Sequence, residues 1–189
     1  MATAGRNDPS RFGEWAAGGL IIAAGLAAYS NSFAAPFLFD DYGTIIDSPS
    51  ITRLWPSAGS LTARRPFTHL TLALNYAAHG LQVWGYHAVN LAIHVLAGLT
   101  LFGVVRRTLL GDRLRGRYGP AASGLALAVA LLWTAHPLQT QSVTYLVQRS
   151  ESLMGLCYLL TLYCVIRAAS SSSPRRWTVG AVGSCALGM

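Results

Sequence analysis

The stretch from residue 83 to residue 105, VWGYHAVNLAIHVLAGLTLFGVV, decides the class of fold. It contains no Arg, Lys, Asp or Glu, and Arg106 and Arg107 follow it directly. A helix needs about 20 mainly apolar residues to cross the hydrocarbon core of a bilayer, and a longer one crosses with some tilt. The stretch therefore predicts a transmembrane helix that stops at the arginine pair.

The rest of the chain has the same composition. Of its 189 residues, 52% are hydrophobic and only 11% are charged, whereas a soluble domain carries about 25% charged residues. Apolar blocks separated by short Arg-rich stretches predict an all-α polytopic membrane protein. The net charge of +7 does not indicate nucleic-acid binding, because the arginines lie between apolar blocks, where the positive-inside rule places them.

Other apolar blocks predict further helices. We expect spans over about residues 15–39, 120–136 and 151–167, a partial span over 177–189, and a helix on the membrane surface over about 66–79. The first block has an alternative interpretation as a signal peptide, but its apolar character continues up to Asp40, which favours an uncleaved anchor. The last block is too short to span, so the chain looks like the N-terminal part of a larger transmembrane domain.

The third and fourth blocks are shorter than a perpendicular span requires. Either they form a shallow re-entrant pair, or the polar link between them dips toward the membrane from one side. Such a link must line a cavity or pack within protein, because lipid cannot satisfy its backbone.

The arginines predict the orientation. With a cytoplasmic N-terminus, ten arginines fall inside and four outside, as the positive-inside rule requires. In this orientation seven ionisable residues lie near the outer membrane surface. They are Asp40, Asp41, Arg64, Arg65, His136, Arg149 and Glu151.

The stretch FLFDDYGTII, residues 37–46, places two of the chain's seven acidic residues side by side at a membrane boundary. Asp40 and Asp41 could simply stop a helix or cap a turn. Alternatively, one is a general base and the other supports it or helps to hold a metal ion. Two close carboxylates raise the pKa of one of them, which suits a base that works near neutral pH.

Several other polar residues have two interpretations. Arg64, Arg65 and Arg149 either contact lipid head groups or bind a phosphate-bearing lipid substrate. Glu151 either pairs with Arg149 or is a second acidic group of the site. His87, Asn90 and His94 fall on one helical stripe, which predicts hydrogen bonds inside a bundle rather than a shared metal.

Three segments resemble a known family: FLFDDYGTIIDSPSI, RPFTHLTLALNYAAHGLQVWGYHAVNLAIHVL and HPLQTQSVTYLVQRSESL. They look like the membrane part of bacterial proteins bearing tetratricopeptide repeats, which are similar to the eukaryotic TMTC O-mannosyltransferases of the GT-C glycosyltransferase fold. The resemblance covers roughly residues 35–165. No repeats are found within the 189 residues, and Gln141 stands where family members often carry Glu.

The resemblance implies a bacterial plasma-membrane enzyme. It would take a sugar from a polyprenyl-phosphate carrier and transfer it to a hydroxyl of a protein or glycan on the outer face. Asp40 or Asp41 would be the base or a metal ligand, and we favour Asp40 as base with Asp41 as its support. His136, Arg149 and Glu151 would face the same cavity, and Arg64, Arg65 or Arg149 would offset the phosphate charge. A divalent metal is compatible with this chemistry but not required.

Two other classes of function remain open. A non-catalytic anchor for tetratricopeptide repeats would tolerate Asn in place of Asp40 and Asp41. A lipid or solute transporter would depend on the stripe of His87, Asn90 and His94 instead.

Overall fold

A computed structural model describes residues 9–52 and 65–189. Within these residues the chain is helical and contains no strand, which confirms the all-α class. Three helical stretches are long and apolar enough to cross a membrane, Gly13–Ala34, Val83–Leu109 and Leu146–Ser170. A fourth candidate span is broken, because Asp112–Thr134 and Pro137–Thr144 meet at an angle of 51°. These candidate spans place the chain in the class of polytopic membrane proteins.

The helices follow one another along the whole described chain. Their bounds are α1 Pro9–Tyr29, α3 Pro66–His79, α4 Val83–Leu109, α5 Asp112–Tyr118, α6 Ala122–Thr134, α7 Thr140–Thr144, α8 Arg149–Ser170 and α9 Pro174–Gly188. Short 3-10 turns lie at Ser30–Ala34, Gly119–Ala121, Pro137–Gln139 and Leu146–Gln148, and a single π-helical turn covers Tyr42–Ile46.

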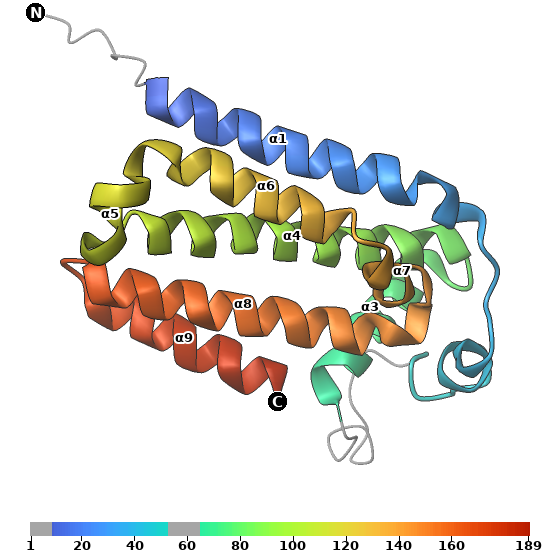
Figure 1. The fold of residues 1–189 in the computed structure, drawn as a ribbon. Helices are drawn as coiled ribbons and strands as arrows, with labels where there is room; N and C mark the ends of the chain where they lie inside the picture. Colours follow the sequence, from blue (N-terminus) through green and yellow to red (C-terminus); the bar gives the residue numbers. More distant parts are fainter. Residues whose placement is uncertain (1–8, 53–64) are drawn as a thin grey trace, which may run out of the picture.

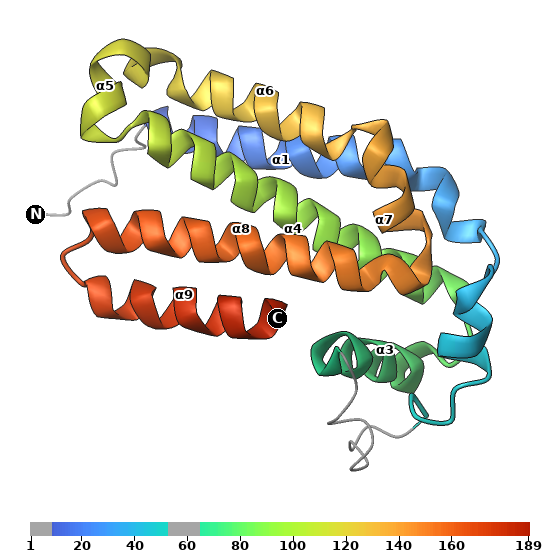
Figure 2. The same ribbon diagram turned by 60° about the horizontal axis from the view of Figure 1, so that its bottom comes forward.

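The long helices lie side by side in a bundle with two distinct ends (Figure 1). Helix α4 packs against α1, α6 and α8, and α9 packs against α8. One end, which we call the loop end, carries residues 35–52, α3 and α7 (Figure 2). The opposite end, which we call the arginine end, carries α5, the last turns of α4 and α8, and the start of α9.

The first apolar block is not one continuous helix. We expected it to reach about residue 39, but α1 stops at Tyr29 and a 3-10 turn ends at Ala34. Ala35 is extended, with ψ of 134°, because the residue before a proline is disfavoured in the α conformation and Pro36 comes next. Residues 35–38 therefore leave the bundle as an extended segment that leads into the two aspartates.

The bundle interior contains the polar stripe of α4. His87, Asn90 and His94 are all buried. Their side-chain N–H groups donate to the carbonyls of Ala35 (3.1 Å), Val143 (3.3 Å) and Thr134 (2.9 Å). In a membrane such bonds join helices where hydrophobic association is weak. The stripe thus ties α4 to α6, to α7 and to the segment that precedes the aspartates.

A separate apolar core fixes the loop end. It consists of Ile45, Ile51, Leu72, Ala73, Tyr86 and Leu146. These residues come from the first loop, from α3, from α4 and from the turn before α8, and each is at most 2% exposed. The loop that carries the aspartates therefore packs directly against α3 and α4.

Candidate functional site

Asp41 points inward at the loop end. Its side chain is 1% exposed, and its two carboxylate oxygens accept hydrogen bonds from the backbone N–H groups of Leu38 and Val147, each at 3.0 Å. The bond to Leu38 resembles the acidic half of a capping box, in which a side chain reaches back three residues to a free N–H. The bond to Val147 joins the first loop to the segment that opens α8.

The surroundings of Asp41 raise the pKa of its carboxyl group above the usual value of 3.8, and the largest cause is burial, which disfavours the charged form. The hydrogen bonds from Leu38 and Val147 and the nearby His87 act in the opposite direction. The negative charge of Asp40 adds a smaller upward effect.

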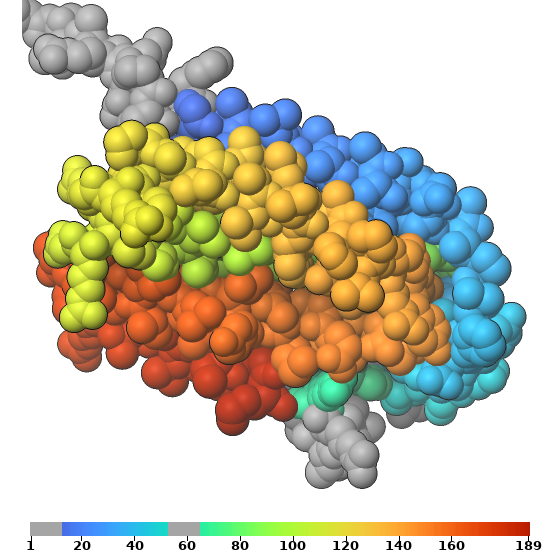
Figure 3. Space-filling view, viewed as in Figure 1, coloured from blue at the N-terminus to red at the C-terminus, as the bar shows by residue number. Residues whose placement is uncertain are grey.

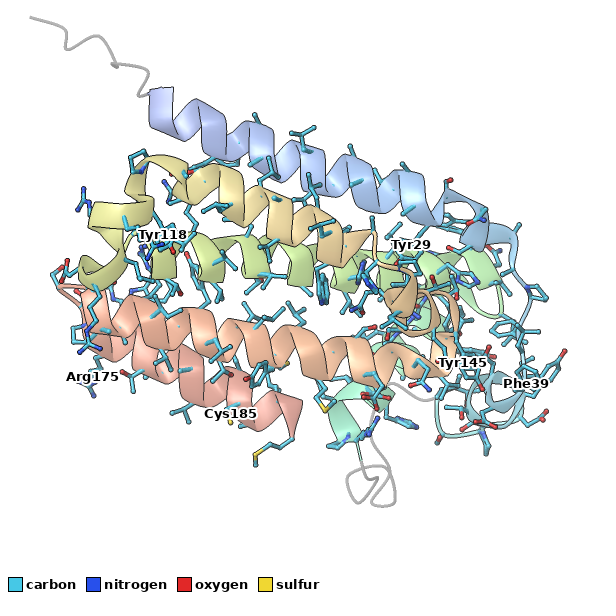
Figure 4. All side chains as sticks on the ribbon, viewed as in Figure 1. Tyr29, Phe39, Tyr118, Tyr145, Arg175 and Cys185 are labelled. Carbon is cyan, nitrogen blue, oxygen red and sulfur yellow. The ribbon has the colours of Figure 1, made fainter. Side chains whose placement is uncertain are left out.

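Asp40, by contrast, is exposed. Its backbone N–H donates to the Tyr145 hydroxyl at 3.0 Å, and none of the described side chains donates to its carboxylate. The preceding Phe39 has a φ of 46°, a left-handed conformation that is strained for a bulky residue. Figure 4 shows Phe39 and Tyr145 at the loop end, and their ring centroids lie 6.5 Å apart in an edge-to-face arrangement.

Arg149 is fully buried, with 0% exposure. Its guanidinium group donates to the side-chain oxygens of Asn90 (2.7 Å) and Asn75 (2.8 Å). It also donates to the backbone oxygens of Tyr86 (3.1 Å) and Thr71 (3.2 Å). Four of its five N–H groups are therefore engaged by neutral oxygens, and Arg149 fastens α8 to α3 and α4. The pairing of Glu151 with Arg149 that we considered is wrong.

Glu151 pairs with Arg65 instead. The two charged groups lie 3.0 Å apart, with side-chain exposures of 41% and 52%. Arg65 also donates to the hydroxyl of Ser150. Because Arg65 precedes the first residue of α3, this contact holds the start of that helix against the start of α8. Arg64, the next predicted residue, lies outside the described residues.

His136 is exposed at the break between α6 and α7. Its Nδ1 accepts a hydrogen bond from the backbone N–H of Leu138 at 3.2 Å and so caps the 3-10 turn at Pro137–Gln139. No hydrogen bond or ion pair joins it to Asp40 or Asp41 within the described residues. Gln141 is also exposed.

Three of the predicted residues, Asp40, Asp41 and Arg65, meet around one short segment, Tyr145–Glu151, whereas His136 does not. Tyr145 and Val147 hold the aspartates, and Arg149, Ser150 and Glu151 hold α3 and α4. Sequence reasoning did not assign Tyr145 or Val147 to the site. Tyr145 lies inside the motif of the second outer segment, whereas Val147 contributes only a backbone N–H, which leaves no signal in a sequence.

The donor set does not match a resident metal site. Both oxygens of Asp41 already accept backbone hydrogen bonds. Within residues 9–52 and 65–189, no three side chains of His, Cys, Asp or Glu come close enough to share an ion.

These features define the class: an all-α polytopic membrane protein whose loop end holds one buried and one exposed carboxylate on a shared segment. No family model and no solved structure matches the chain. Curated proteins do. The chain is 30% identical to the protein O-mannosyl-transferase Tmtc3 of Drosophila melanogaster over an alignment of 196 positions, gaps included, that covers 88% of the chain and 21% of that protein.

Two more relatives give the same picture. Protein O-mannosyl-transferase TMTC2 of Homo sapiens is 32% identical over 172 residues, covering 82% of the chain and 19% of the relative. Protein O-mannosyl-transferase Tmtc1 of Drosophila melanogaster is 33% identical over 147 residues, covering 70% of the chain and 16% of the relative. TMTC-type proteins are thus homologues over most of the chain, and the chain spans about a fifth of the length of these relatives.

Proposed function

We propose that the chain is the N-terminal membrane part of a glycosyltransferase that moves a sugar from a polyprenyl-phosphate donor to a hydroxyl group of a protein or glycan. The names of the relatives support mannose as the sugar and a protein as the acceptor. The observation that carries the proposal is that the two aspartates have different environments. Asp41 is buried and accepts hydrogen bonds from two backbone N–H groups, whereas Asp40 is an exposed carboxylate on the same loop.

In this mechanism Asp40 is the general base. Its carboxylate takes the proton of the acceptor hydroxyl while the hydroxyl oxygen attacks the anomeric carbon of the sugar. A new carbon–oxygen bond forms, the bond from that carbon to the phosphate oxygen breaks, and polyprenyl phosphate leaves with the electron pair. Asp41 is a positioning residue, because it fixes the turn that presents Asp40. The strained backbone of Phe39 sits directly before this base, as is common at functional sites.

The departing phosphate needs positive charge nearby. Among the described residues, Arg65 is the best candidate for contacting the phosphate, since half of its side chain is exposed and its ion pair with Glu151 holds it at the loop end. Arg64 precedes it in the sequence, and the exposed His136 is a further polar contact for substrate. We assign Arg149 a different part: its donors are engaged inside the protein, so it positions α3 and α8 and acts on the phosphate only through its charge.

Further parts of the proposal rest on the resemblance and on the arginine distribution. They are a GT-C fold, a bacterial plasma membrane, a cytoplasmic N-terminus with the loop end outside, and tetratricopeptide repeats in the remaining part of the protein. The arginine end supports this orientation, because the positive-inside rule favours cations on the cytoplasmic side.

The test uses the full-length gene in its own membranes and follows radiolabelled mannose from polyprenyl-phosphate donors to protein. Asp40→Asn should lower transfer by about 10²–10⁴-fold, the usual contribution of a general base, while the protein stays inserted. Asp47→Asn is the matched control, since Asp47 is an exposed acid of the same loop and should retain wild-type transfer. Undiminished transfer by Asp40→Asn would remove Asp40 as the base. No transfer by wild type from any such donor would favour the non-catalytic anchor.

A further inference from the structure

Two arginine–aromatic pairs meet at the arginine end. Arg107 of α4 donates to the hydroxyl of Tyr163 at 3.2 Å, and its guanidinium carbon lies 5.4 Å from the centre of that ring. Arg167 of α8 lies 4.3 Å from the ring centre of Trp177 of α9. The rings of Tyr163 and Trp177 touch edge to face at 6.0 Å. Three helices thus build one cluster of two cations and two aromatic rings, which we call the Arg107–Arg167 cluster.

The charges of this cluster are not neutralised by the described part of the chain. Neither arginine lies in an ion pair, and the nearby Glu14 is already paired with Arg106. The Nε atom of Arg167 is shielded from solvent and has no hydrogen-bond partner among the described residues. A buried charged donor without a partner costs free energy. Arg167 as a whole is only half-buried, so the exposed part of its side chain can meet an acceptor oxygen from outside the chain.

The cluster also lies at the depth of lipid head groups. The candidate spans end at Leu109 and Ser170, only two and three residues beyond its arginines. Tyr and Trp side chains gather at this level of a membrane. Helix α9 begins here at Pro174, so the unpaired N–H groups of its first turn add partial positive charge. Figure 4 shows Arg175, in this first turn, at the same end of the bundle.

The other sides of the same helices carry exposed apolar side chains. Val165 of α8 and Val179 of α9 are 53% and 66% exposed. Each lies two residues from Arg167 or Trp177 and therefore points to another side of its helix, where it contacts the lipid around the cluster. An anionic lipid could place its phosphate at the cations and its acyl chains in this surrounding apolar layer. Basic pockets between transmembrane helices bind lipid head groups in this way, and guanidinium forks match phosphate oxygens.

We propose that the Arg107–Arg167 cluster binds the phosphate of an anionic phospholipid whose acyl chains remain in the surrounding bilayer. The site is at the opposite end of the bundle from Asp40, and the inference does not depend on the proposed sugar transfer.

The experiment measures lipid retention by native mass spectrometry on the delipidated chain in detergent micelles. Phosphatidylglycerol and phosphatidylcholine are added to wild type, Arg107→Gln, Arg167→Gln and the control Arg115→Gln. Arg115 is an exposed arginine of α5 at the same end, without an aromatic partner in the described structure. We expect wild type to prefer phosphatidylglycerol. Each cluster variant should weaken that binding about fivefold, which corresponds to about 1 kcal/mol for one arginine near a charged surface. The Arg115 variant should match wild type.

Equal retention of both lipids by wild type, or an equal loss in the Arg115 variant, would overturn the site. Displacement of phosphatidylglycerol by inorganic phosphate would replace the lipid with a soluble anion and overturn the proposal as well. The melting temperature of wild type gives a readout that needs no variant. Phosphatidylglycerol should raise it and phosphatidylcholine should not, because a ligand that binds the folded state stabilises that state.

Discussion

Asp40 and Asp41 are adjacent in sequence but differ in every physical respect that matters for chemistry. One is exposed and the other is 1% exposed with two backbone hydrogen bonds. Two neighbouring carboxylates usually raise one pKa by mutual repulsion. Here burial is the largest cause of the raised pKa of Asp41, and the charge of Asp40 has the smallest effect on it. Asp41 therefore has a positioning role, and the carboxylate of Asp40 remains free.

Asp41→Asn should destabilise the folded chain. An asparagine side chain has one acceptor oxygen, so the part-buried N–H of either Leu38 or Val147 loses its partner. The expected cost is about 1–3 kcal/mol in the free energy of unfolding, measured by thermal unfolding in detergent. Asp40→Asn serves as the control and should change stability by no more than about 0.5 kcal/mol, the usual range for an exposed position. Equal stability of both variants would show that the two hydrogen bonds contribute nothing.

The stability difference between wild type and Asp41→Asn should also depend on pH. The folded-state pKa of Asp41 is raised above 3.8, so the folded chain holds this proton more tightly than the unfolded chain. The resulting stabilisation is complete below the unfolded pKa and is lost as pH rises through the folded pKa. The stability difference between wild type and Asp41→Asn should therefore shrink as pH rises from about 4, the ordinary aspartate value. A difference that grows with pH would mean that the hydrogen bonds outweigh burial.

Arg149 contributes through packing at the residue scale. Arg149→Gln should leave at least the carbonyl oxygen of Asn75 or Asn90 without its donor, at about 1–3 kcal/mol for each buried acceptor that stays unpaired. The melting temperature should fall accordingly. Arg65→Gln, which removes an exposed ion pair, should cost only about 0–1 kcal/mol. A larger effect at Arg65 than at Arg149 would contradict the assignment of Arg149 as the internal fastening.

At the scale of elements, α4 is the helix on which the others assemble. It contacts α1, α6 and α8, and its glycines permit close approach. A Cβ atom placed on Gly98 would lie 2.6 Å from Oγ1 of Thr134 in α6 and 3.3 Å from Ile21 in α1. Thr134 is fully buried. Small residues at such crossings are characteristic of helix packing in membranes.

Gly98→Leu should therefore separate α4 from α6 and destabilise the chain by about 1–3 kcal/mol, the usual cost of overpacking a core. Gly124→Leu is the matched control, because nothing lies within 4 Å of a Cβ placed at that position of α6. Thermal unfolding in detergent compares the two variants. Comparable losses in both would show that the cost comes from removing a glycine and not from the crossing.

At the scale of the whole molecule, the two ends of the bundle differ in the charged residues that they carry. The loop end holds the aspartates, and the arginine end holds the cations of α5 and of the ends of α4 and α8. The space-filling view shows α6, α7 and α8 covering one face between these ends (Figure 3). Exposed apolar side chains such as Leu132 (72%) and Tyr158 (65%) lie on the helices between the ends, as expected for a surface in contact with lipid.

The proposed orientation can be tested by labelling single cysteines in intact cells. With the three native cysteines replaced by serine, Tyr42→Cys at the loop end should react with a membrane-impermeant maleimide. Arg115→Cys should react only after the membrane is opened. Both positions are exposed, so accessibility depends on the side of the membrane. The reverse pattern would place the loop end inside and overturn the outer-face mechanism.

The sequence by itself determined the class of the protein. Apolar length and the absence of charge predicted a span over residues 83–105, because each residue contributes its own transfer free energy to a helix that crosses lipid. The helix α4 begins where expected but continues through Arg106 and Arg107 to Leu109. The same local signal predicted that His87, Asn90 and His94 face the bundle, since a polar stripe on such a helix needs partners. It did not predict the early end of α1, because apolar character continues through an extended segment.

Only the tertiary structure decided which aspartate is buried and what Arg149 binds. The second partner of Asp41 is the backbone N–H of Val147, 106 residues away, and every residue type except proline carries such a group. Likewise, the partners of Arg149 are amide and backbone oxygens brought together from α3 and α4. Hydropathy and motif spacing report what a residue is, whereas these roles depend on which distant backbone groups folding leaves without another partner.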